Sequence, residues 1–114
     1  PLAREVLEPA HPQLQAALMV QASAYEGIGD LAREITAYRE VLQMRRAKLG
    51  EGDAGTIEVA WKLSRALEAA GNQQESVDLR SRYVMPLLTA TKVTLTPALD
   101  KLAEKIRTSE AEKA

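Results

Sequence analysis

The chain contains few of the residue types that carry out chemistry in proteins. Its 114 residues include one histidine, His11, and no cysteine. A histidine that acts as a general base needs an orienting acid and a nucleophile, whereas His11 stands in the proline-flanked sequence Pro9-Ala10-His11-Pro12. The lack of cysteine excludes disulfides, thiol catalysis and cysteine-ligated zinc within these residues. We therefore expect that the chain is not an enzyme.

The other polar residues show no spacing that indicates a metal or cofactor site. No histidine lies one helical turn from a second metal ligand, and pairs such as Glu68 and Glu75 arise by chance among 16 acidic residues. The glycines of Gly50-Glu51-Gly52 do not follow a predicted strand, so they are not a phosphate-binding loop. We expect no metal and no cofactor.

The charge balance excludes several classes of partner. Basic residues number 15 and acidic residues 16, so a net charge of −1 gives no general attraction to nucleic acid or to anionic membranes. No apolar run approaches the roughly 20 residues of a membrane-spanning helix. The chain begins at Pro1 and shows no signal-peptide pattern. We expect a piece of a longer protein, located in the cytoplasm.

One basic cluster stands out against this balance: Arg45, Arg46 and Lys48. Such a cluster can contact a phosphate or an acidic partner. It can equally place positive charges where they are favourable, at the C-terminus of a helix. We favour the second interpretation.

The elements that position these residues are predicted to be helices. Strong helix formers dominate the composition, aromatics make up 4%, and only residues 92–96 resemble a strand. Pro86 stands well inside the fourth predicted helix, so we expect a kink or an early stop there. The predicted helices cover about 12–27, 31–49, 54–70, 73 to the region of Pro86, and a segment that begins at Thr96-Pro97.

These helices form a repeat. A shift of 42 residues pairs Gly29 with Gly71 and Asp30 with Asn72, and apolar positions stay in register. Each unit reads as two helices joined by a glycine turn. The predicted organisation is a remnant of a preceding repeat over 1–10, a first repeat over 11–52, a second over 53–94 and a C-terminal helix over 95–114.

The motifs of the first unit are a linker followed by small, glycine and aromatic positions: Val6-Leu7-Glu8-Pro9-Ala10-His11-Pro12, Ala24-Tyr25, Gly29-Asp30-Leu31, Tyr38 and Val41-Leu42. In this order they resemble the tetratricopeptide-repeat (TPR) family, most closely the 42-residue variety of kinesin light chains and many bacterial multidomain proteins. The resemblance covers roughly residues 6–88. It implies an all-α, right-handed α-α solenoid of about two TPR helix pairs plus a C-terminal capping helix.

Several positions depart from the family pattern. The small residue that lets the second helix of each pair pack closely is Glu34 in the first repeat and Ser76 in the second. The aromatic residue of that helix is Tyr38 in the first repeat but Arg80 in the second. Gln21 occupies a usual leucine position. The second repeat is therefore the poorer match, as is common beside a capping helix.

The resemblance also implies a function, which is non-catalytic binding of a peptide or helix on the concave face of the first helix of each pair. Trp61 lies off the apolar stripe of its helix, so it either contacts a partner or packs under a neighbouring repeat or the C-terminal helix. Both alternatives stay open. Mapped onto this sequence, the predicted peptide-binding groove carries Met19, Ser23, Glu26, Glu58, Trp61, Arg65 and Glu68.

Two other functions remain as alternatives. About two repeats is fewer than the three usually needed for stability, so an end with Leu2, Val6 and Leu7 could stack on another copy and form a homo-oligomer. The chain could also be the regulatory TPR region of a multidomain signalling enzyme. The helix after Thr96 either caps the stack or occupies the groove.

Overall fold

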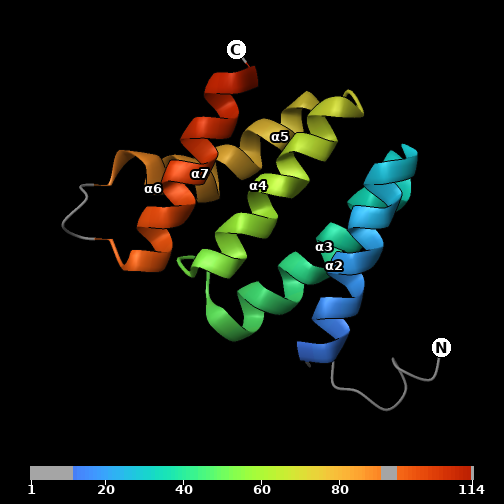
Figure 1. Ribbon diagram of the computed structural model, residues 1–114, viewed down its shortest axis with the longest axis horizontal. Helices are drawn as coiled ribbons and strands as arrows, with labels where there is room; N and C mark the ends of the chain where they lie inside the picture. Colours follow the sequence, from blue (N-terminus) through green and yellow to red (C-terminus); the bar gives the residue numbers. More distant parts are fainter. Residues whose placement is uncertain (1–11, 91–94, 114) are drawn as a thin grey trace.

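The computed structural model describes residues 12–90 and 95–113, and this part of the chain is helical without any strand (Figure 1). The all-α class is therefore confirmed. The expectations for His11, for the preceding repeat and for residues 91–94 lie outside the described residues. The helices are α2 (Pro12–Ile28), α3 (Leu31–Leu49), α4 (Ala54–Ala69), α5 (Gln73–Leu79), the π-helix η1 (Arg80–Val84), α6 (Met85–Thr89) and α7 (Pro97–Lys113).

The two predicted glycine turns share one backbone hydrogen-bond pattern. Gly29 and Gly71 adopt φ angles of 78° and 88°, a left-handed conformation that favours glycine. The Gly29 N–H donates to the carbonyl of Glu26 at 3.2 Å, and the Gly71 N–H donates to that of Glu68 at 3.0 Å. The two turns therefore share one backbone conformation at positions 42 residues apart.

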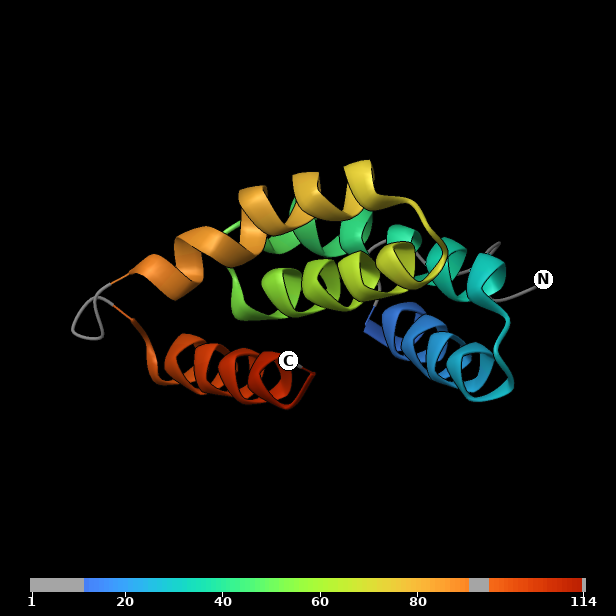
Figure 2. The same ribbon diagram turned by 90° about the horizontal axis from the view of Figure 1, so that it is seen from above.

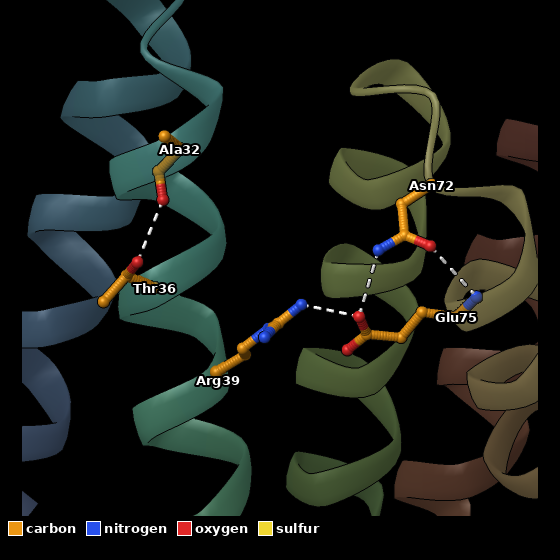
Figure 3. Close-up of polar contacts among 5 residues, drawn as sticks. All are labelled: Ala32, Thr36, Arg39, Asn72 and Glu75. Carbon is orange, nitrogen blue, oxygen red and sulfur yellow. Dashed lines mark hydrogen bonds and ion pairs between the residues drawn. The ribbon is translucent and has the colours of Figure 1, made fainter.

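The helices that follow these turns begin with the predicted caps. The Asp30 carboxylate accepts a hydrogen bond from the N–H of Arg33 at 3.2 Å, and the Asn72 side chain accepts one from that of Glu75 at 3.3 Å. Glu75 also accepts a bond of 2.6 Å from the Arg39 guanidinium (Figure 3). This contact links the exposed surfaces of α3 and α5.

The early stop predicted at Pro86 does not occur, because the chain stays helical to Thr89. The distortion is instead the π-helix η1, which ends directly before α6. There the N–H of Met85 donates to the carbonyl of Arg80, five residues back rather than four. The wider turn accommodates a proline that has no N–H to donate and whose ring crowds the preceding turn.

The other helices lie on two sides of α4. Figure 2 shows α2 and α7 on one side of α4, with α3 and the α5–α6 segment on the other. Each helix packs mainly on the next in the chain, and α7 returns to contact both α4 and α6. The arrangement places α4 between the two ends of the described part.

The central position of α4 explains its burial. Trp61, Leu63 and Leu67 are each at most 2% exposed, and they join Val41 of α3 and Ile106 of α7 in one apolar core. A helix with neighbours on several sides needs apolar residues over most of its circumference. That is why Trp61 can lie off the main apolar stripe and still be buried.

The C-terminal helix α7 packs on this core. Its first turn is capped by Thr96, whose hydroxyl accepts a hydrogen bond from the N–H of Leu99 at 3.2 Å. Leu102 and Ile106 are buried, as their spacing predicts. The helix continues to Lys113.

Candidate peptide-binding face

A cavity of about 330 Å³ lies among α2, α3 and α4. The polar residues that line it come from all three helices. Because α2 and α4 are the first helices of the two pairs, the cavity lies where the predicted groove passes from one repeat to the next. The polar lining consists of Ser23 and Glu26 from α2, Glu34 and Tyr38 from α3, and Lys62 and Arg65 from α4.

Three of the seven predicted groove residues meet at this cavity. Ser23, Glu26 and Arg65 all line it, and all three are exposed. Met19 and Glu68 do not line it: Met19 packs partly buried against the core, and Glu68 is half-buried. The structure therefore brings three of the seven predicted groove residues to one cavity and leaves the other four outside it.

Trp61 is not available to a partner in this structure, because its side chain is only 2% exposed. Of the two alternatives, the structure shows the packed one. Trp61 and Arg65 face Arg80 of η1 and Glu110 of α7 across a small gap of about 10 Å³. The Arg65 guanidinium lies 5.1 Å from the centre of the Trp61 ring, a distance at which a cation is attracted by the ring face. The Trp61 ring thus helps to hold the Arg65 guanidinium in position.

Glu58 lies at a different site, beside α7. Its carboxylate accepts a hydrogen bond of 2.9 Å from the Lys105 ammonium. Burial acts to raise the pKa of Glu58, but the bond and charge of Lys105 and the charges of Lys62 and Arg45 outweigh it, so the pKa is lowered. A second cavity, of about 340 Å³, is lined by Glu58 and Lys105 between the start of α4 and α7. The helix α7 therefore closes this end of the predicted face.

Glu34 is a cavity residue that the predicted groove does not include. It is only 5% exposed although it is acidic. Burial and the negative charge of Glu26 raise its pKa, while the positive charge of Arg65 acts in the opposite direction. Burial, followed by the charges of Glu26 and Glu34, also raises the pKa of Tyr38 to about 12. The sequence signal for Glu34 is that a glutamate stands where the TPR pattern has a small residue.

The equivalent residue of the second repeat behaves differently. Ser76 is 2% exposed, and its hydroxyl donates a hydrogen bond of 2.8 Å to the carbonyl of Ser64 in α4. The small side chain allows α5 to lie directly on α4. Ser76 does not line the cavity that contains Glu34.

The basic cluster of the sequence is divided in two by the structure. Arg45 is half-buried and donates to the carbonyl of Gly55 at 2.9 Å and to the Gln15 side chain at 3.2 Å, so it links α3 to the starts of α4 and α2. Arg46 and Lys48 are exposed in the last turn of α3. Their position agrees with the favoured interpretation, in which positive charges lie at a helix C-terminus.

The described residues contain no group of three or more acidic or histidine side chains placed to hold a metal ion. None of the helices described between residues 12 and 113 has both the length and the apolar character needed to cross a membrane. In comparisons with known proteins, no family model, no curated protein and no solved structure matches the chain.

Proposed function

We propose that this chain is a non-catalytic interaction module that binds a peptide or a helix through the face formed by α2 and α4. The observation that supports the proposal is the cavity at their junction, where Ser23, Glu26 and Arg65 meet. Exposed groups of both charges around a cavity can select a partner by charge and orient it. The TPR resemblance implies binding on this same face.

The burial of Trp61 changes the design of the test. A Trp61→Ala variant would remove a core side chain and confound binding with unfolding. Arg65 is a better probe because it is exposed and lines the cavity. Arg46 offers a matched control, since it is an exposed arginine on α3 and does not line the cavity.

The experiment begins with selection of binders from a library of random dodecapeptides displayed on phage. Selected peptides are then synthesised with a fluorophore, and binding to the wild type, Arg65→Glu and Arg46→Glu is measured by fluorescence anisotropy. Circular dichroism first establishes equal helicity of the three proteins. We expect Arg65→Glu to change binding about tenfold or more and Arg46→Glu to change it less than about twofold.

Two results would count against the proposal. One is a library that gives no peptide enriched over a blank surface. The other is an equal change in binding from both charge reversals, because binding would then depend on net charge rather than on the α2–α4 face.

Self-association is the second candidate function, and the outer side of α2 favours it. Val20 and Ile28 are 70% and 75% exposed and lie eight residues apart, on the same side of the helix. Sedimentation equilibrium over a hundredfold range of concentration tests this candidate. A rise in mass that the double variant Val20→Ser, Ile28→Ser abolishes would favour self-association, whereas a constant monomer mass would exclude it. A regulatory role within a signalling enzyme remains a further proposal.

A further inference from the structure

Glu34 differs from the other acidic side chains that lie where helices meet. Glu58 has Lys105 at 2.9 Å, and Glu110 has Arg80 at 2.5 Å. Glu34 is 5% exposed, yet none of the hydrogen bonds or ion pairs found among residues 12–90 and 95–113 involves its carboxylate. A largely buried carboxylate without a partner is unfavourable, because the little water that reaches it replaces only part of its lost hydration.

The cations beside Glu34 do not supply the missing partner of its carboxylate. Lys62 and Arg65 line the same cavity, but neither comes within ion-pair distance of the carboxylate. Arg65 lies over the Trp61 ring and affects the pKa of Glu34 only through its charge. The nearest acidic group, Glu26, acts against Glu34 and adds a second negative charge to the cavity.

The cavity itself provides access to the carboxylate. Its volume of about 330 Å³ is at the lower end of the roughly 300–1,000 Å³ typical of small-ligand sites, so it suits one side chain rather than a folded segment. Leu31 and Ala66 add apolar surface to the lining, against which an alkyl chain can pack. A long side chain that ends in a cation fits all three properties.

We infer that the cavity among α2, α3 and α4 receives a lysine or arginine side chain of the bound peptide, with the Glu34 carboxylate as its partner. The inference rests on the proposed function and specifies its ligand. The cation would restore the contact that Glu34 lacks, and Glu26 would attract it at the exposed side. Lys62 and Arg65 also line the cavity and would attract an acidic side chain, but only a cation would supply the ion-pair partner that Glu34 lacks.

The first part of the test uses the peptides selected from the dodecapeptide library. Each Lys or Arg of the best binder is replaced in turn by norleucine, and binding to the wild type, Glu34→Gln and Glu104→Gln is measured by anisotropy. Glu104 is a matched control because it is an exposed glutamate on α7 and does not line the cavity. We expect one cationic position whose loss weakens binding about tenfold or more, and a similar loss with Glu34→Gln but not with Glu104→Gln.

A double-variant comparison shows whether the two groups act on each other. If they are partners, the norleucine peptide loses little further affinity when Glu34→Gln is added. Peptides that bind without any cationic residue, or bind Glu34→Gln as tightly as the wild type, would overturn the inference and leave the proposed function intact. So would binders in which an aspartate or glutamate takes the sensitive position.

The second part separates failure of this inference from failure of the proposed function. The wild type and Glu34→Gln are titrated with n-butylguanidinium chloride and with the neutral analogue n-butylurea, and amide shifts are followed by NMR. We expect saturable shifts at Glu34, Tyr38 and Ala66 with the cation alone, weakened about tenfold or more in Glu34→Gln. If these occur while no peptide is selected, the cation site stands and the peptide-binding function falls. If the shifts do not occur, the cation site is wrong.

Discussion

The α2–α3 hairpin and the α4–α5 hairpin turn in the same way but enclose different interiors. Both use a glycine with positive φ followed by a capping Asx residue. Four residues after the capping residue, Glu34 stands in one hairpin and Ser76 in the other. The serine hydroxyl completes its hydrogen bond within the fold, whereas the glutamate carboxylate lines a cavity. Two hairpins with the same turn therefore differ in the surroundings of equivalent side chains.

The largest effect on stability is expected at Trp61, because the two hairpins differ most clearly in burial at this position. Its counterpart 42 residues earlier, Met19, is only partly buried. Trp61→Ala should reduce the free energy of unfolding by about 3–5 kcal/mol, because it leaves a large cavity in the core. Met19→Ala should cost only about 1 kcal/mol. Urea unfolding followed by circular dichroism measures both, and equal losses would contradict the difference in burial.

Exchange of the residue types at positions 34 and 76 is the most direct test of the comparison between the two hairpins. Ser76→Glu should destabilise the protein by about 3 kcal/mol, since a carboxylate would replace a hydroxyl at a site that is 2% exposed and next to α4. Glu34→Ser should stay within about 1 kcal/mol of the wild type because the carboxylate makes no hydrogen bond or ion pair that would be lost. Thermal unfolding of both variants provides the measurement. A large loss in Glu34→Ser would show that Glu34 has a structural role.

The ionisation of Glu34 predicts that the free energy of unfolding depends on pH, with a smaller effect than the substitutions above. The folded protein raises the pKa of Glu34 above its ordinary value of 4.5. Below pH 4.5 the carboxyl is protonated in both folded and unfolded states, so the wild type loses nothing relative to Glu34→Gln. As the pH rises through the folded pKa, the unfolded state is favoured by its easier ionisation and the wild type loses stability.

Glu34→Gln should therefore be the more stable protein at neutral pH, with a difference that disappears well below pH 4.5. Melting temperatures of both proteins between pH 3 and pH 8 test this. Glu104→Gln serves as the control, for which no such pH-dependent gain is expected. If Glu34→Gln were less stable than the wild type at neutral pH, the carboxylate would have a partner after all.

The smallest effect is expected for the ion pair that joins the two hairpins on their outer surface. Arg39 and Glu75 are 2.6 Å apart, but their side chains are 49% and 38% exposed. Solvent and salt screen such a pair, so a double-mutant cycle with alanine should give about 0.2–1 kcal/mol, reduced further in 1 M NaCl. A coupling above about 2 kcal/mol would mean that this contact, and not the core, holds the hairpins together.

Much of the local structure could be predicted from particular residues. Gly29, Gly71, Asp30 and Asn72 act on the backbone within a few residues of themselves, so their effect is readable without a fold. Pro86 was a partial success, because its disturbance of the helix was expected but its accommodation by a π-helix was not. That outcome depends on the packing of α5 and α6 against α4 and α7, which keeps the chain helical.

The candidate site could be predicted less completely. Ser23, Glu26 and Arg65 were placed on one face by helical spacing and the TPR resemblance, and they do line one cavity. Glu34 was recognised only as a departure from the family pattern. Its burial results from helices that are distant in sequence, and no local pattern reports that distance.

The helices and the two glycine turns 42 residues apart could be predicted from the sequence, because they depend on backbone conformation and on hydrogen bonds between near neighbours. Which side chains are enclosed depends on how the helices pack. That packing buries Trp61, pairs Glu58 with Lys105 of α7, and leaves Glu34 beside a cavity without an ion-pair partner. Burial and charge pairing depend on contacts between segments far apart in the chain, so they appear only when the helices are packed together.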